Sequence, residues 1–226
     1  MSIGLSEQEI LRREAMAELR KLGINPYPPD AFDVNVTASD IKENYLRDKT
    51  SYKNISFAGR IMSRRIMGSA SFAEVQDATG RIQVYINRDD ICPTEDKTLY
   101  NTVFKKLLDI GDFVGIQGYV FTTKTNEISI HVSKLTVLAK SLKPLPIVKR
   151  DDDGHVFDGF TDPEMRYRQR YVDLTVNPDF KQIFINRSRV INTMRGYFDS
   201  QGWMEVETPI LQPVHGGAAA RPFKTH

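Results

Sequence analysis

Residues 54–86, NISFAGRIMSRRIMGSASFAEVQDATGRIQVYI, decide the fold that we predict for this chain. They contain three short runs in which apolar and polar residues alternate. This period of two places one set of side chains on each face of a β-strand. The runs are separated by Gly68 and Ser69 and by residues 77–80 (DATG), both of which are typical turn sequences. We therefore predict three consecutive strands with one apolar and one polar face.

The polar face of these strands has the chemistry of a surface for single-stranded nucleic acid. It carries Arg60, Phe72, Glu74, Gln83 and Tyr85, with Arg65 at its rim. Aromatic rings stack on bases, which contributes roughly 1–3 kcal/mol per base. Arg65 can neutralise a phosphate, and Gln83 can read a base edge through its donor and acceptor groups. The alternative is an ordinary amphipathic sheet whose polar side is simply wetted.

The order of the elements that follow predicts the type of barrel. Residues 97–108 have helical spacing of apolar side chains, and residues 113–121 and 127–138 alternate as strands do. Three strands, a helix and two strands over residues 54–142 form the order of an oligonucleotide-binding (OB) barrel, in which the first three strands provide the binding face. This agreement favours nucleic-acid binding over the wetted sheet. His131 is interpreted as an isolated surface residue, because no second ligand or carboxylate lies at a telling spacing from it.

Helices are predicted before and after the barrel in the sequence. Residues 6–23 form one, in which Ser6 and Glu9 have the spacing of a capping box. This helix either docks on the barrel through a thin apolar stripe or uses its basic residues to contact nucleic-acid backbone. After a proline-containing hinge, residues 179–200 are predicted as a long helix and residues 204–210 as a strand.

Composition sets few limits on the function. The 226 residues have a formal net charge of +2, so any basic surface must be local. The single cysteine, Cys92, rules out an internal disulfide and fits a reducing compartment. No apolar run approaches the ~18 residues of a membrane span, and the N-terminus does not have the pattern of a signal peptide. A cytoplasmic protein is the expectation.

Four segments carry a resemblance to a known family. Residues 59–85 (GRIMSRRIMGSASFAEVQDATGRIQVY) resemble the anticodon-binding barrel of the aspartyl, asparaginyl and lysyl enzymes. Residues 162–174 (DPEMRYRQRYVDL) resemble the entry to a catalytic domain, and residues 185–211 are similar to motif 1 of class II synthetases. Residues 215–226 (HGGAAARPFKTH) match the loop before motif 2 in the lysyl branch. The chain thus resembles the class II lysyl-tRNA synthetases.

The resemblance implies a fold, a reaction and a set of site residues. A five-stranded OB barrel with an N-terminal helix would precede the first helix and strand of a class II α+β catalytic domain. The enzyme would activate lysine with ATP and Mg²⁺ and load it on tRNA(Lys), whose U-rich anticodon the barrel would hold. Phe72 matches the ring that stacks on an anticodon base, and Tyr85 matches a second aromatic. Gln83 and Arg65 match base- and backbone-contacting positions, and Glu74 would discriminate against a wrong base.

The resemblance also extends to the second half of the chain. Pro209 and the helix before it match the dimer interface, so a homodimer is expected for the full-length enzyme. Gly216 and Gly217 match the loop that lines the lysine pocket. Motifs 2 and 3 do not occur in these 226 residues. We therefore expect a truncated, catalytically inactive chain with no catalytic residue, no metal ligand and no bound cofactor.

The expected domains are an N-terminal helix and arm (1–53), the OB barrel (54–142), a linker (143–178) and the start of the catalytic domain (179–226). The sequence leaves two other functions open. One is a non-enzymatic OB barrel that binds single strands in general. The other is part of an aspartyl- or asparaginyl-tRNA synthetase, against which the HGGAAARPF sequence argues.

Overall fold

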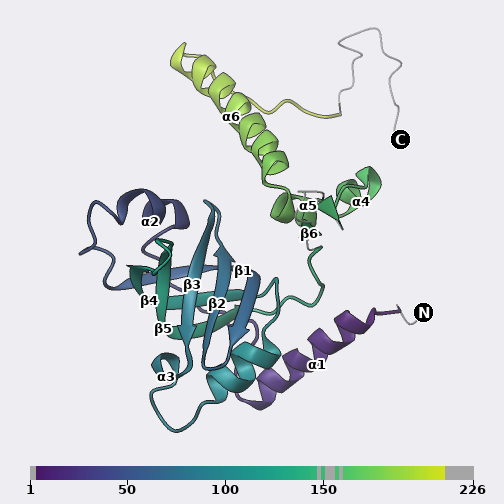
Figure 1. Cartoon of the computed structure of the whole chain (residues 1–226). Helices are drawn as coiled ribbons and strands as arrows, with labels where there is room; N and C mark the ends of the chain where they lie inside the picture. Colours follow the sequence, from purple (N-terminus) through teal and green to yellow (C-terminus); the bar gives the residue numbers. More distant parts are fainter. Residues whose placement is uncertain (1–3, 147–148, 151–155, 158–159, 212–226) are drawn as a thin grey trace. The chain divides into compact units, whose positions relative to one another are not determined.

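The computed structural model describes residues 4–146, 149–150, 156–157 and 160–211 (Figure 1). The chain divides into two compact units, Met1–Pro146 and Ile147–His226. The first unit holds a β-barrel with helices, and the described part of the second is mainly helical.

Five strands of the first unit form a closed barrel in the order β1-β2-β3-β5-β4. Neighbouring strands are antiparallel except β3 and β5, which are parallel. The strands are β1 Ile55–Met67, β2 Ala70–Gln76, β3 Arg81–Asn87, β4 Phe113–Thr122 and β5 Ile128–Ala139. A helix lies between β3 and β4, so the predicted OB order is confirmed.

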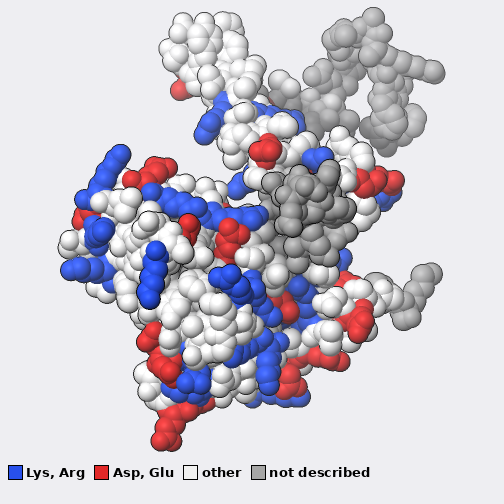
Figure 2. All heavy atoms as spheres, in the orientation of Figure 1, with Lys and Arg blue, Asp and Glu red and all other residues white. Residues whose placement is uncertain are grey.

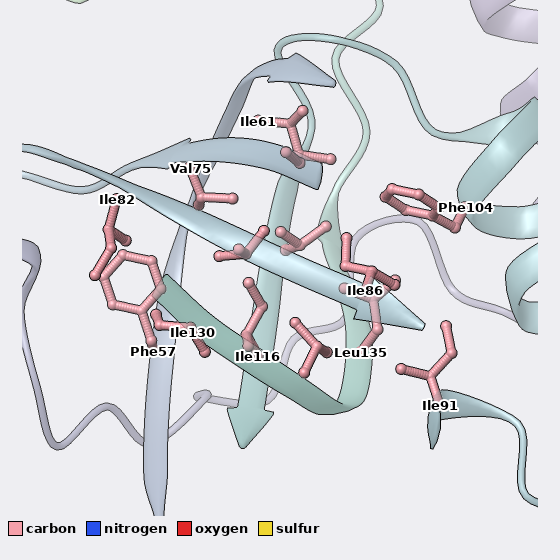
Figure 3. Packing of buried hydrophobic residues seen from close by; sticks show 14 of the residues in the cluster. Phe57, Ile61, Val75, Ile82, Ile86, Ile91, Phe104, Ile116, Ile130 and Leu135 are labelled. Atoms are coloured by element: carbon pink, nitrogen blue, oxygen red, sulfur yellow. The ribbon is translucent and has the colours of Figure 1, made fainter. Parts of the chain in front are cut away.

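Alternation along β2 and β3 determines which side chains enter the core (Figure 3). Ala73, Val75, Ile82 and Val84 are at most 3% exposed, whereas the residues between them are partly exposed. Burying a valine or isoleucine side chain contributes about 1.5–3 kcal/mol. A slip of one residue would exchange the two faces, so this core also fixes the outward direction of Phe72.

Turns at both ends of β2 have the chemistry expected from the sequence. Gly68, between β1 and β2, has a φ of +64°, a conformation that glycine adopts without steric cost. In the next turn, one carboxylate oxygen of Asp77 accepts hydrogen bonds from the backbone N–H groups of Thr79 (2.7 Å) and Gly80 (2.8 Å). The other accepts from the backbone N–H of Ala38 (2.8 Å) and so joins this turn to a helix.

Two capped helices precede the barrel. In α1, Glu7–Lys21, the Ser6 hydroxyl accepts from the Glu9 backbone N–H (3.3 Å) and the Glu9 carboxylate accepts from the Ser6 N–H (3.0 Å). This capping box confirms the one expected from the sequence. In α2, Ala38–Asn44, the Thr37 side chain caps the first turn.

A buried arginine docks α1 on the barrel unit. Arg12 is 6% exposed and donates to the carbonyl oxygens of Ile110 (2.9 Å) and Ser141 (3.2 Å). Leu19, which is fully buried, adds the apolar part of the contact. Arg12 therefore has a structural role, because its guanidinium donates hydrogen bonds to one carbonyl just before β4 and to another just after β5.

The segment between β3 and β4 contains two helices. The helix expected at residues 97–108 is present as η1, Leu99–Leu107, which has the wider turn of a π-helix and buries Tyr100 and Phe104. Before it, Arg88–Ile91 form the one-turn helix α3. Asn87 caps the N-terminus of α3, because its side chain accepts a hydrogen bond from the Asp89 backbone N–H (2.8 Å).

Ion pairs centred on a buried carboxylate order the described start of the second unit. Its elements are β6 Lys149–Arg150, β7 Val156–Phe157, α4 Pro163–Arg168, α5 Arg170–Val176 and α6 Pro178–Ser200. Asp173 is buried and accepts from Arg166 (2.8 Å), Asn177 (2.7 Å) and Arg170. Burial alone would raise the pKa of Asp173, but the hydrogen bond from Asn177 and the two guanidinium groups hold this pKa below its usual value.

The long helix was predicted correctly, but the strand after it was not. Helix α6 begins one residue before the expected range and ends at its last residue, Ser200. Residues 204–210, expected to form a strand, have no regular secondary structure. A strand exists only when a neighbour accepts and donates its backbone hydrogen bonds, and no segment of the described chain pairs with these residues.

Candidate nucleic-acid interface

Strand pairing brings the five predicted anticodon-binding residues into two adjacent rows on the outer face of the barrel. In one row Arg65 of β1 lies opposite Phe72 of β2, which lies opposite Tyr85 of β3. In the next row Glu74 lies opposite Gln83. The structure therefore brings together residues that the sequence places up to 20 positions apart.

A groove of about 460 Å³ runs along these rows. Arg65, Phe72, Glu74 and Gln83 line it, and the ring of Tyr85 lies 5.2 Å from the ring of Phe72. Further lining residues were not expected from the sequence: Lys42, Ser63, Arg64, Ala73, Arg81 and Glu127. Lys42 comes from α2, which contacts β3, and Glu127 comes from the turn before β5, the strand that pairs with β3.

The charges of the groove are mixed, with basic groups in excess. Arg81 forms an ion pair with Glu74 at 3.2 Å, and both side chains are 41% exposed. Arg64 donates to the Phe104 carbonyl (2.8 Å), and burial lowers the pKa of its guanidinium. Figure 2 shows Lys and Arg side chains among Asp and Glu over the visible face of the barrel unit. Arg60, expected on this face, instead donates to the Gly111 carbonyl (2.8 Å) away from the groove lining.

Gln83 presents a defined group to the groove. Its Oε1 accepts a hydrogen bond from the buried hydroxyl of Ser129 on β5 (2.9 Å). With this oxygen engaged, the amide nitrogen, which carries two N–H donors, is the group that remains for a ligand. Such a donor matches the carbonyl oxygens of an unpaired pyrimidine base.

The aromatic row continues beyond Tyr85. Because β3 pairs with β5, Tyr85 lies opposite His131, and their rings are 5.1 Å apart. His131 in turn stacks on Tyr119 of β4 at 4.7 Å with an interplanar angle of 9°. The interpretation of His131 as an isolated surface residue was wrong, since its side chain is 18% exposed and pairs with Asp90 at 3.3 Å.

The site residues expected in the second unit do not form a site within the described residues. Pro209 lies in an exposed segment without regular secondary structure, and Gly216 and Gly217 lie outside the described residues. The exposed apolar side of α6 and the residues after it form a hollow of about 760 Å³, lined by residues that include Ile191, Met194, Phe198, Trp203 and Met204.

Among the residues that the structure describes, no group of three or more His, Cys, Asp or Glu side chains could hold a metal ion. No helix among the same residues is long and apolar enough to cross a membrane.

Comparison with known families and proteins supports a division of the chain into two parts. Residues 55–138 match the family of OB-fold nucleic acid binding domains, and residues 162–226 match the class II tRNA synthetases of the D, K and N group. A lysine–tRNA ligase of Porphyromonas gingivalis is 60% identical over 223 residues, which are 98% of this chain and 38% of that protein.

Two further lysine–tRNA ligases are similar to the chain over nearly its whole length. That of Christiangramia forsetii is 56% identical over 98% of this chain and 38% of its own length. That of Azobacteroides pseudotrichonymphae is 56% identical over 98% of this chain and 44% of its own length. The chain thus spans less than half the length of these curated relatives.

Proposed function

We propose that the chain is part of a lysine–tRNA ligase of class II and that it supplies the tRNA-binding part of that enzyme. The whole enzyme would attach lysine to tRNA(Lys) at the expense of ATP. The barrel, residues 54–142, would bind the U-rich anticodon. The observation that carries the proposal is the groove in which Phe72, Gln83 and Arg65 meet.

Each groove residue has a role that follows from its contacts. Phe72 would stack on one anticodon base, and Tyr85 beside it would support a second. The Gln83 amide would donate to a uracil oxygen while Ser129 holds its other end. Arg65, whose guanidinium lies 5.9 Å from the Phe72 ring, would neutralise the phosphate next to the stacked base.

Glu74 would contribute selectivity rather than affinity. Its carboxylate accepts from Arg81 and lies opposite Gln83 in the sheet. A carboxylate accepts hydrogen bonds only, so it favours a base edge that carries a donor and repels one that carries only acceptors. This feature favours an anticodon reader over a barrel that binds single strands in general.

The second unit would begin the catalytic domain. In the family resemblance, ATP and Mg²⁺ belong to the full-length enzyme, and the described residues provide no group of side chains that fits a metal ion. Pro209 would lie at a homodimer interface, and the exposed apolar residues of α6 supply a surface that a second subunit could cover. Gly216 and Gly217 would line the lysine pocket. A cytoplasmic location and the domain limits 1–53, 54–142, 143–178 and 179–226 belong to the same proposal.

Replacing Phe72 with alanine is expected to weaken binding of an RNA hairpin with UUU in its loop by about 1–3 kcal/mol, because one stacking platform is lost. Fluorescence anisotropy with the labelled hairpin measures this effect. Lys134→Ala, at an exposed position of β5 outside the groove lining, is the matched control and should bind as the parent does. Unchanged affinity in Phe72→Ala would exclude the stacking role.

Competition between hairpins separates the proposed function from its rivals. Hairpins with the lysine, aspartate or asparagine anticodon in the same stem, and an unstructured oligonucleotide, compete for the labelled UUU hairpin. Preference for the lysine anticodon supports the proposal. Equal competition by the unstructured oligonucleotide would favour general single-strand binding instead.

A polypeptide of these 226 residues is expected to bind RNA without forming lysyl-adenylate. Adenylate formation depends on positioned groups that stabilise the charge of the phosphates, and motifs 2 and 3 are not in this sequence. Lysine-dependent exchange of pyrophosphate into ATP is the assay. A full-length relative assayed in parallel shows that the conditions are adequate, and clear exchange by the 226-residue polypeptide would refute the expectation.

A further inference from the structure

A row of rings crosses the barrel from the groove to strands that the predicted site does not include. The row consists of Phe72, Tyr85, His131 and Tyr119, which come from β2, β3, β5 and β4. Successive ring centres are 5.2, 5.1 and 4.7 Å apart. The last two residues are not among those that line the groove. The aromatic surface is therefore longer than the part assigned to the anticodon.

Tyr119 is the exposed end of this row. Tyr119 is 41% exposed although its ring stacks on His131. Phe121 supports the pair from the next outward position of β4, with ring centres 6.5 Å from Tyr119 and 5.8 Å from His131. An exposed ring that packs on neighbouring rings can act as a stacking platform for a base.

His131 is held in a fixed orientation beneath Tyr119. Its Nε2 lies 3.3 Å from the carboxylate of Asp90 in α3, and Tyr85 and Phe121 contact the ring from other sides. Its Nδ1 is buried and has no hydrogen-bond partner among the described residues. The cluster is thus packed in advance, and a ligand that stacks on Tyr119 would not have to order it.

We propose that Tyr119, supported by His131, binds one further unpaired base of the same RNA strand, next to the bases that the groove reads. The inference rests on the proposed function, because it continues the strand that lies on Phe72 and Tyr85. Stacking suits this position, because every base has a π-face and an aromatic ring stacks on any base without recognising its edge. Tyr119 would therefore extend the footprint on the loop without adding to anticodon identity.

An abasic scan tests this inference with the full 226-residue chain. Each loop position of the UUU hairpin is replaced in turn by an abasic nucleotide, and affinities are measured for the parent and for Tyr119→Ala. We expect one position outside the UUU triplet at which the abasic change weakens the parent roughly 5- to 150-fold. Tyr119→Ala should lose affinity for the intact hairpin by a similar factor and be insensitive to the abasic change at that position.

Two control variants make the result specific. Tyr119→Phe retains the ring and should behave as the parent. Tyr171→Ala removes another exposed tyrosine, which lies in the second unit, and should also leave the scan unchanged. Thermal melting verifies that Tyr119→Ala is folded, as expected for a side chain at the barrel surface.

The outcomes distinguish this inference from the proposed function. If Phe72→Ala weakens binding and no position outside the triplet depends on Tyr119, the further base site does not exist although the barrel reads the anticodon. If the abasic change outside the triplet lowers the affinities of the parent and of Tyr119→Ala equally, another residue holds that base and the inference fails. If the parent chain binds the UUU hairpin no better than the unstructured oligonucleotide, the proposed function itself fails.

Discussion

Replacing Gly118 with alanine is expected to destabilise the barrel by about 3 kcal/mol, the upper end of the usual cost of overpacking. A Cβ atom built on Gly118 would lie 1.9 Å from the carbonyl oxygen of His131 and 3.3 Å from the backbone nitrogen of Ser133. These are backbone atoms of the neighbouring strand β5, which no rotamer change can move away. The strands would have to separate at the point where they pair.

Gly118 also lies where the register between β4 and β5 shifts, between Gln117 and Gly118. Irregularities of this kind bend a strand and re-aim the side chains that follow. The residue that follows is Tyr119, opposite His131. The same substitution should therefore disturb the aromatic row as well as the stability of the barrel.

Urea denaturation followed by intrinsic fluorescence measures the loss. Gly80→Ala is the matched control in the same unit, because its Cβ would meet only the Cβ of Ala38 at 3.9 Å, an ordinary contact. We expect the control to differ from the parent by about 0.5 kcal/mol at most, as surface substitutions do. Equal stability of Gly118→Ala and Gly80→Ala would show that β5 can move aside at little cost.

The barrel could be predicted because its signals are local. Alternation along β2 and β3 depends only on neighbouring residues, and it places Phe72 and Tyr85 outward by the same pattern that buries Val75 and Val84. The turn at Asp77 and the capping box at the start of α1 are likewise complete within a few residues. These parts of the fold follow from side-chain chemistry at short range.

The parts that sequence reasoning missed depend on contacts between distant strands. His131 was interpreted as an isolated residue because its neighbours in space, Tyr85 and Tyr119, are 46 and 12 positions away. Lys42 reaches the groove because α2 packs against β3, and Glu127 because β5 pairs with β3. Once the OB order is predicted, the pairing of β3 with β5 is the one signal that could have placed His131 beside Tyr85.

The second large effect is expected for Lys140→Met, which should lower the free energy of unfolding of the barrel unit by about 3–5 kcal/mol. Lys140 follows β5, and its ammonium group is fully buried between Asp109 and Asp112. The Asp112 side chain is also fully buried, with its oxygens 2.9 Å from the ammonium and 2.7 Å from the Ser141 N–H. Removing the lysine leaves a buried carboxylate without its counter-charge.

Lys134→Met is the control, since Lys134 is an exposed lysine on the same strand. Its free energy of unfolding should lie within about 0.5 kcal/mol of that of the parent. Similar values for the two variants would mean that the buried pair contributes no more than a surface charge.

The dependence on pH distinguishes a stranded charge from a simple loss of packing. Burial raises the pKa of Asp112, while Lys140 and the N–H groups of Asp109 and Ser141 oppose this rise. In Lys140→Met the first of these opposing groups is gone, so the pKa of Asp112 should rise further. The unfolded pKa of such a carboxyl is about 3.9. At pH values between the unfolded pKa and a higher folded pKa, the folded state binds more protons than the unfolded state.

The free energy of unfolding of Lys140→Met should therefore increase as the pH is lowered from 7 towards 4, relative to that of Lys134→Met. Adding Asp112→Asn to Lys140→Met removes the titrating group and should abolish this relative gain. In Lys140→Met, low pH should restore only part of the lost free energy of unfolding. Both Asp112 oxygens accept hydrogen bonds from backbone N–H groups, and a protonated oxygen accepts less well. A destabilisation that is the same at every pH would show that lost packing, rather than the uncompensated carboxylate, is the cause.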